Sequence, residues 1–158
     1  MQLSLFQPED LPAVAAFVEG IQEVELRLCP DMAPPGEIGG AQTAFLLRTA
    51  AEQDGVVLLA KSGMETVGFV CAWIEHDEDL TLREEARTYG FISDVFVAPL
   101  WRRKGVATRL LAAIEETMRK RGCHRFRIHV KAGNDAAARC YEAAGYGAYE
   151  VIFLKRPG

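Results

Sequence analysis

The residues with the clearest chemical use form a basic, glycine-containing stretch, Arg102-Arg103-Lys104-Gly105-Val106-Ala107, directly before a helix pattern. A helix N-terminus has backbone N–H groups without partners and a partial positive charge, and a glycine lets an anion approach the backbone. Three cations beside such an end favour a pyrophosphate site. The patterns GxxxxGK[ST] and GxGxxG do not occur, which argues against ATP and NAD as ligands.

The elements on both sides of this stretch must hold it in place. Tyr89–Val97 has the apolar residues of a buried strand, and Pro99 ends it. The following helix is expected to end at Gly122, a typical C-terminal cap. Its apolar residues recur every four positions, at Val106, Leu110, Ile114 and Met118.

A further strand, helix and strand are expected downstream. Phe126–Val130 alternates apolar with polar residues, as a half-buried strand does. Asn134 is a typical N-cap for a helix that runs through Ala144 and stops at Gly145. Tyr149–Leu154 is predicted as a last strand, so this half of the chain is expected to be β-α-β-α-β.

The first half is predicted to begin with a strand and two helices, followed by a hairpin. The first helix starts after Pro8 and ends before a break at Cys29-Pro30. Prolines and glycines at positions 34–40 indicate a loop before the second helix. The expected elements are a strand at 3–6, a first helix with its apolar positions between Leu11 and Ile21, a second helix at 41–53, and hairpin strands at 56–60 and 66–75.

Composition favours one soluble domain over residues 1–158. The 158 residues are 49% hydrophobic, enough for a core of their own. No signal peptide and no apolar run of membrane-spanning length is found, so a cytoplasmic protein without membrane contact is expected. The four cysteines form no CxxC pair and predict no metal site.

Charge is divided unequally along the chain. Residues 1–98 have 5 basic and 17 acidic residues, a net charge of −12, whereas residues 99–158 have 13 and 5, a net charge of +8. The sum is the overall −4. Such a division suits an enzyme that holds an anionic cofactor with one half and a cationic acceptor with the other.

Two linked motifs resemble the GNAT superfamily of acyl-CoA-dependent N-acyltransferases. Arg102-x-x-Gly105-x-Ala107 fits its [QR]-x-x-G-x-[GA] signature after a strand ending in Val97-Ala98-Pro99. The downstream pattern V-x-x-x-N-x-x-A-x-x-x-Y-x-x-x-G-[FY] is matched in register by Val130, Asn134, Ala137, Tyr141, Gly145 and Tyr146. The resemblance implies an α/β fold with a mixed, mainly antiparallel sheet flanked by helices, and a splay between two central strands that holds acetyl-CoA.

The resemblance also implies the cofactor-binding residues and one catalytic residue. Tyr141 would be the general acid toward the leaving thiolate, with packing at a helix end as the alternative role. The pantetheine would pair with the backbone around Phe96, where an N–H would polarise the thioester carbonyl. The implied cofactor contacts are Val95, Phe96, Val97, Arg102, Arg103, Lys104, Gly105, Val106, Ala107, Thr108, Asn134, Ala137 and Tyr141.

The group that takes the proton of the amine is left open by the sequence. Many relatives have a Glu where this chain has Ser93, followed by Asp94, and strand alternation turns these two side chains to opposite faces. Asp94 and Glu75 are the candidate catalytic carboxylates. Further candidates, each with a surface role as the alternative, are Glu23, Glu25 and His129.

These observations predict an N-acetyltransferase that moves an acetyl group to a primary amine on a small molecule or peptide, cationic in nature. Homodimers are expected by analogy with such folds. The alternative is a module that senses acyl-CoA with little turnover, which Ser93 would permit. A nucleic-acid surface is not expected, because the chain is acidic overall and its basic cluster 119–127 lacks interleaved aromatic residues for stacking.

Overall fold

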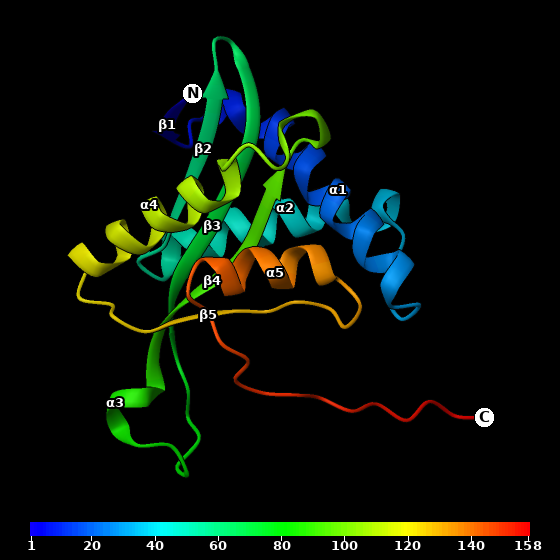
Figure 1. Ribbon diagram of the computed structural model, residues 1–158, viewed down its shortest axis with the longest axis vertical. Helices are drawn as coiled ribbons and strands as arrows, with labels where there is room; N and C mark the ends of the chain where they lie inside the picture. The colour runs from blue at the N-terminus through cyan, green and yellow to red at the C-terminus, as the bar shows by residue number, and fades with distance from the viewer.

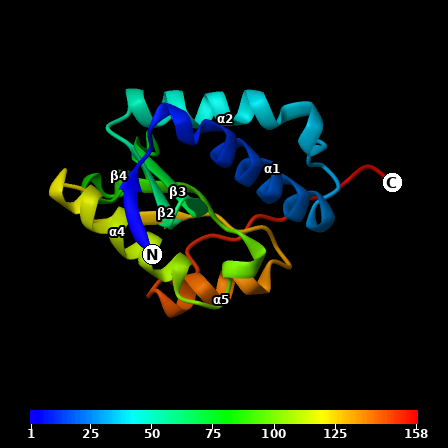
Figure 2. The ribbon, with the colours of Figure 1, turned by 90° about the horizontal axis from the view of Figure 1, so that it is seen from above.

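A computed structural model describes residues 1–158, with one five-stranded sheet in the order β1-β2-β3-β4-β5. Helices cover both faces of the sheet, as the ribbon in Figures 1 and 2 shows. The elements in chain order are β1 (Gln2–Leu5), η1 (Pro8–Asp10), α1 (Leu11–Leu28), α2 (Pro35–Glu52), β2 (Val56–Ser62), β3 (Glu65–His76), α3 (Glu84–Arg87), β4 (Thr88–Val97), η2 (Pro99–Trp101), α4 (Val106–Lys120), β5 (Phe126–Ile128) and α5 (Asp135–Ala143). No helix is long and apolar enough to cross a membrane.

The sheet is mixed and mainly antiparallel, which confirms the predicted fold class. The four strands β1 to β4 pair antiparallel, and β5 pairs parallel with β4. This parallel pairing covers only Gly90–Ile92 against Phe126–Ile128. Beyond Ile92, β4 continues to Val97 without a partner on that side, so the two strands diverge.

Each face of the sheet has its own hydrophobic core. Leu110, Ile114 and Met118 of α4 pack on one face with Val70 of β3, and all four are fully buried. Val14 of α1 and Leu46 of α2 pack on the other with Leu59 of β2. Figure 2 shows the two resulting layers, with α1 and α2 on one side and α4 and α5 on the other. The sheet is thereby held rigid, and its diverging strands lie between the layers.

Helix α2 begins earlier than its sequence predicts. The proline- and glycine-rich positions 34–40 were expected to form a loop, but the helix starts at Pro35, a favoured first residue. One of the glycines serves packing: a Cβ atom on Gly39 would lie 2.7 Å from Glu19 Cγ of α1. Gly39 therefore allows α1 and α2 to approach closely, and this benefit outweighs its low helix propensity.

The predicted last strand, Tyr149–Leu154, is not formed. The segment is extended but has no strand partner, and its side chains are exposed. The neighbouring strand β5 is also shorter than the predicted Phe126–Val130, with three paired residues, so its outer edge offers little to a further strand. The terminal segment runs past β5 as a separate arm (Figure 1), and Arg156 pairs with Asp31 at 2.9 Å.

A substitution at Gly55 tests how tightly the sheet is packed. A Cβ atom there would overlap the Ala72 carbonyl oxygen and lie 2.8 Å from Ala50 Cα, and neither backbone can move freely. Gly55→Ala is expected to lower the free energy of unfolding by about 1–3 kcal/mol, measured by chemical denaturation. Gly40→Ala, with open space around it in α2, is the control and is expected to raise it by about 0.5–1 kcal/mol. Equal effects would contradict this packing.

Candidate active site

A β-bulge in β4 shapes the centre of the site. Cys71 of β3 faces Asp94, but the next residue, Ala72, faces Ile92, so Ser93 is an extra residue in β4. A bulge of this kind interrupts the alternation of side chains. The expectation that Ser93 and Asp94 point to opposite faces is therefore wrong, because both side chains line the same cavity.

That cavity lies on the α1 and α2 side of the sheet and has a volume of about 410 Å³. Three carboxylates line it: Glu25 from α1, Glu75 from β3 and Asp94 from β4. The remaining lining residues are Val18, Ile21, Gln22, Met32, Ile38, Gln42, Phe45, Trp73, Phe91 and Ser93. A cavity with anionic groups and apolar walls suits a cationic organic molecule.

Asp94 has the properties of a proton acceptor at neutral pH. Burial raises the pKa of its carboxyl from 3.8 to about 6; the Ser93 hydroxyl, which donates at 2.6 Å, lowers that pKa and nearby Glu25 raises it. Burial also raises the pKa of Glu25, against the opposing charge of Lys131. A carboxylate with a pKa just below the working pH is ionised and still basic, as general-base catalysis requires.

Glu75 is held differently from Asp94. Its Oε1 accepts a hydrogen bond from Trp73 Nε1 at 2.8 Å, and its Oε2 accepts one from the Tyr89 hydroxyl at 3.2 Å. Both oxygens are thus engaged, which fixes the orientation of the carboxylate. These contacts suit a group that binds a ligand in a fixed position.

The other proposed proton acceptors lie further from the cavity. Glu23 is exposed, and Arg27 on the same helix lies 3.8 Å from it. His129 follows β5 and is exposed, with its ring centroid 5.0 Å from that of Phe91. Neither Glu23 nor His129 lines the cavity.

The loop before α4 has the backbone geometry expected of an anion site. Arg103 and Gly105 adopt left-handed conformations, with φ of 58° and 75°, and no side chain caps the helix N-terminus. The first N–H groups of α4 therefore have no partner within the helix. Among the predicted cofactor contacts, Val106, Ala107 and Thr108 supply these N–H groups.

The three cations of this loop do not lie alike. Arg102 turns back toward the sheet, where its Nε donates to the Val97 carbonyl at 3.0 Å and its guanidinium covers the Phe96 ring. Lys104 lies over the Trp101 ring at 5.0 Å. Arg103 is exposed and makes no hydrogen bond or ion pair. The sequence predicts a role in cofactor binding for all three cations, but in the structure Arg102 is hydrogen-bonded to the last residue of β4.

Helix α5 carries the second sequence motif, which contains Asn134, Ala137 and Tyr141, on the side of the splay opposite the free edge of β4. Asn134 caps the helix as predicted, accepting a hydrogen bond from the Ala137 N–H at 3.2 Å. Burial, together with the nearby Cys140, Asp94 and Glu25, raises the pKa of Tyr141 to about 12. The phenol therefore keeps its proton at neutral pH, which suits a proton donor.

Sequence analysis did not identify the aromatic wall or the partners of Glu75. Trp73 and Tyr89 lie in predicted strands and Phe45 lies in a predicted helix, but the sequence predicts no role in the site for these residues. The alternation of Cys71, Trp73 and Glu75 along β3 was the available signal, because it places the indole and the carboxylate on one face. The cavity that these residues share is also lined by α2, which begins earlier than its sequence predicts.

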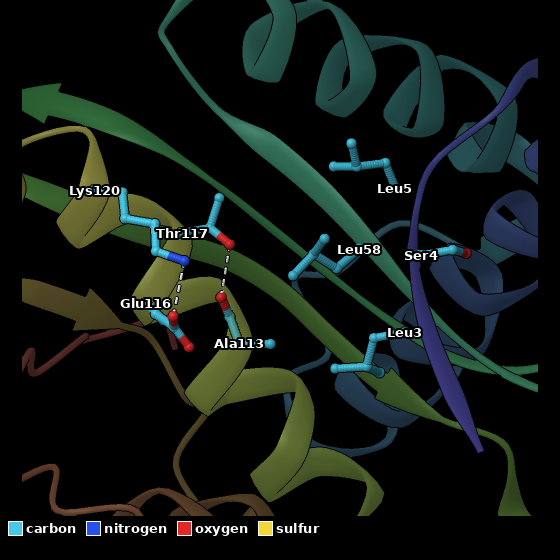
Figure 3. A pocket seen from close by; sticks show the side chains of 8 residues that line it. All are labelled: Leu3, Ser4, Leu5, Leu58, Ala113, Glu116, Thr117 and Lys120. Atoms are coloured by element: carbon cyan, nitrogen blue, oxygen red, sulfur yellow. Dashed lines mark hydrogen bonds and ion pairs between the residues drawn. The ribbon is translucent and has the colours of Figure 1, made fainter.

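A second cavity, of about 420 Å³, lies between β1 and α4 (Figure 3). Its lining residues are Leu3, Ser4, Leu5, Leu58, Ala113, Glu116, Thr117 and Lys120. Glu116 pairs with Lys120 at 2.8 Å, and the Thr117 hydroxyl donates to the Ala113 carbonyl at 2.8 Å. The polar groups that α4 contributes are thus satisfied within the helix, whereas the buried Ser4 hydroxyl of β1 has no partner. The cavity contains none of the predicted site residues. The slightly smaller cavity beside Asp94 is the candidate site.

Replacing Asp94 should stabilise the protein at neutral pH. Because the pKa in the folded chain lies above 3.8, ionisation costs folding free energy, and stability falls as the pH rises toward 6. Asp94→Asn should raise the melting temperature at pH 7 by a few degrees, with a smaller gain near pH 4. Carboxyl NMR titration should give a pKa near 6, and a higher one in Ser93→Ala, which lacks the donor. A pKa near 4 would contradict this description.

Known proteins match the chain in sequence and in fold. The model of the acetyltransferase (GNAT) family matches residues 23–146. An aminoglycoside N(6')-acetyltransferase type 1 of Stenotrophomonas maltophilia is 29% identical over 137 residues, which cover 85% of this chain and 84% of that protein. An uncharacterised N-acetyltransferase, YycN of Bacillus subtilis, is 33% identical over 84 residues, covering 53% of this chain and 51% of its own.

Solved structures share the whole fold. Aminoglycoside 6'-N-acetyltransferase AAC(6')-IG from Acinetobacter haemolyticus superposes with a TM-score of 0.72 and 18% identity, covering 99% of each chain. A GCN5-related N-acetyltransferase from Ralstonia eutropha gives a TM-score of 0.78 and 15% identity, again over 99% of each chain. At these identities the likeness concerns the fold alone. The family match over residues 23–146 shows that this chain belongs to the acetyltransferase (GNAT) family, and together with the related sequences it shows an acetyl-CoA-dependent N-acetyltransferase.

Proposed function

We propose that residues 1–158 act as one domain that binds acetyl-CoA in the splay between β4 and β5 and acetylates a small cationic amine held in the cavity beside Asp94. One observation carries this proposal above the others. The unpaired edge of β4 begins at the bulge, where Ser93 and Asp94 line the carboxylate-lined cavity, and continues to Val97, after which a short segment leads to the uncapped N-terminus of α4. An anionic cosubstrate and a cationic acceptor would thus meet at Ser93 and Asp94.

The cosubstrate would lie along two walls of the splay. Backbone groups of Val95, Phe96 and Val97 on the free edge of β4 would pair with the pantetheine. On the opposite wall, Asn134, Ala137 and Tyr141 of the α5 segment would contact it. The pyrophosphate would lie against Gly105 and the N–H groups of Val106, Ala107 and Thr108, with Arg103 and Lys104 supplying charge. Arg102 would support the loop through its bond to Val97.

The proton transfers can be assigned to two side chains. Asp94 would accept a proton from the bound ammonium, directly or through one water, since an alkyl amine has a pKa of about 10 and arrives protonated. The neutral nitrogen then attacks the thioester carbonyl carbon, and the backbone N–H near Phe96 would stabilise the oxyanion. As the C–S bond breaks, Tyr141 would give its proton to the departing sulfur, and the resulting phenolate would regain a proton from the nitrogen, which carries an extra one after the attack. Glu75, the other predicted catalytic carboxylate, has both oxygens engaged and suits binding instead.

The acceptor is proposed to be a small-molecule or peptide amine with a positive charge. Three carboxylates around the cavity support this, because a positively charged ligand would stabilise these negative groups. The relative from Stenotrophomonas maltophilia is named for aminoglycoside N(6')-acetylation, so aminoglycosides belong in any acceptor screen. A cytoplasmic location is also proposed, supported by four free cysteines, which suit a reducing compartment.

Acetyl-CoA binding is expected to depend on the loop before α4. The double variant Arg103→Ala, Lys104→Ala should weaken acetyl-CoA binding about tenfold or more, because two charge-assisted contacts are removed. Isothermal titration calorimetry measures the affinity. Arg125→Ala, which removes an exposed arginine after α4, is the matched control and should bind as the wild type does. Absence of acetyl-CoA binding by the wild type would refute the proposed function.

Removing the Tyr141 hydroxyl should slow turnover without weakening binding. Tyr141→Phe keeps the ring but removes the proton donor, so kcat is expected to fall about 100-fold or more, with an unchanged Kd for CoA. Thiol release measured with an amine acceptor gives kcat. Tyr146→Phe removes the neighbouring phenol, whose hydroxyl donates to Glu115 instead, and should retain most activity. Equal losses in both variants would assign Tyr141 a packing role.

We also propose that two copies of the chain associate as a homodimer. The support is the C-terminal arm, where Val151, Ile152, Phe153 and Leu154 are 71%, 84%, 94% and 64% exposed. Consecutive large apolar side chains of this kind are typical of interaction surfaces.

Charge in the arm should prevent this association. Ile152→Lys combined with Phe153→Lys is expected to convert a dimer into a monomer, because two cations cannot be buried in an apolar contact. Light scattering coupled to size-exclusion chromatography measures the mass. Met64→Lys, at the exposed tip of the β2–β3 hairpin, should leave the mass unchanged. If the wild-type chain is a monomer at high concentration, the proposed homodimer is wrong.

A further inference from the structure

We infer that the acceptor is an aliphatic diamine or polyamine, and that Glu75 binds its second ammonium group while Asp94 deprotonates the first. This inference rests on the proposed function and narrows its acceptor from any cationic amine to one chemical class. It also gives Glu75 a role in specificity, because hydrogen bonds from Trp73 and Tyr89 hold its carboxylate in place at the cavity.

Glu75 is built into a network that holds its carboxylate in one orientation. Trp73, whose Nε1 donates to Glu75, is 4% exposed, and the Tyr89 ring that carries the second donor is 8% exposed. The Arg127 guanidinium covers the Tyr89 ring at 3.8 Å and pairs with Asp77 at 3.3 Å. A rigid carboxylate that lines a cavity loses little entropy when it binds an ammonium group.

The wall between the two carboxylates is aromatic. Cys71, Trp73 and Glu75 occupy successive positions on one face of β3, and Asp94 lies opposite Cys71. The indole of Trp73 therefore lies between the two carboxylates. Phe91 packs against it with ring centroids 5.5 Å apart, and Phe45 does so at 6.4 Å. Such rings favour methylene groups along their faces and attract cations at close range.

The distance between the two carboxylates suits an extended alkyl chain. Glu75 is four residues beyond Cys71 along β3, so a rise of about 3.3 Å per residue separates the two backbone positions by roughly 13 Å. The side chains of Asp94 and Glu75 cover part of this separation. A chain of several methylene groups with an ammonium group at each end would span the remainder.

Hydroxyl-rich amines are less well matched to the same cavity. Gln22 already donates to the Ala33 carbonyl at 2.8 Å, Ser93 donates to Asp94, and both oxygens of Glu75 have donors. Glu25 and Gln42 are the polar lining residues whose side chains make no hydrogen bond within the chain. These two groups replace little of the water around many sugar hydroxyls, and an unpaired buried hydroxyl is costly. The carboxylates, in contrast, are best satisfied by cations.

Four acceptors test this inference in the acetyl-transfer assay. Hexamethylenediamine, hexylamine and aminocaproate present the same chain with a cationic, apolar or anionic far end, and kanamycin represents hydroxyl-rich amines. The diamine should have a kcat/KM about ten- to hundredfold above that of hexylamine, beyond the roughly twofold statistical advantage of its two equal ends. Aminocaproate should be poorer than hexylamine, and kanamycin poorer than the diamine.

Substitutions then assign the preference to its residue. Glu75→Gln should remove the diamine advantage through KM, whereas Glu23→Gln, which removes an exposed carboxylate of α1, should leave the advantage intact. Tyr89→Phe, which frees one oxygen of Glu75, should raise KM for the diamine alone. Equal kcat/KM for diamine and hexylamine, an advantage that survives Glu75→Gln, or faster use of kanamycin would overturn the inference. Failure to acetylate any amine would instead refute the proposed function, and the inference with it.

Discussion

The bulge at Ser93 is the constraint on which the site depends. A regular β4 would turn Asp94 into the core beneath α4, where a carboxylate has no partner and no route to an acceptor. One extra residue brings Ser93 and Asp94 to the same cavity and ends the pairing of β4 with β5 close by. The free edge of β4 and the proton acceptor thus arise from one local irregularity. Its rigidity comes from the cores that α1, α2 and α4 form on the two faces of the sheet.

The site separates charges that would otherwise oppose each other. All three cavity carboxylates come from residues 1–98, which have a net charge of −12, and the cations of the α4 loop come from the half with +8. The acidic half lines the α1 and α2 side of the sheet. The basic half supplies the loop before α4 and the wall of the splay that faces β4. Burying Asp94 costs stability at neutral pH, yet the same burial gives its carboxyl a pKa suited to proton transfer.

Sequence patterns predicted the elements whose signals are local. The four-residue apolar repeat of α4 and the Asn134 cap of α5 depend on neighbouring residues, and both agree with the structure. The bulge could not be predicted, because Ser93 and Asp94 read as an ordinary alternation and only the register against β3 reveals the extra residue. The early start of α2 depends on the contact of Gly39 with Glu19, which is distant in sequence. The strand predicted at 149–154 has the right residues but no partner within one chain.

The central claim, that Asp94 takes the proton of the amine, is tested most directly by the pH dependence of kcat/KM for an alkyl amine. The account predicts that kcat/KM rises with pH and levels off above an apparent pKa of about 6, and that Asp94→Asn loses this transition together with most activity. A rate that climbs without a transition near 6 toward the amine pKa of about 10, alike in wild type and variant, would contradict it.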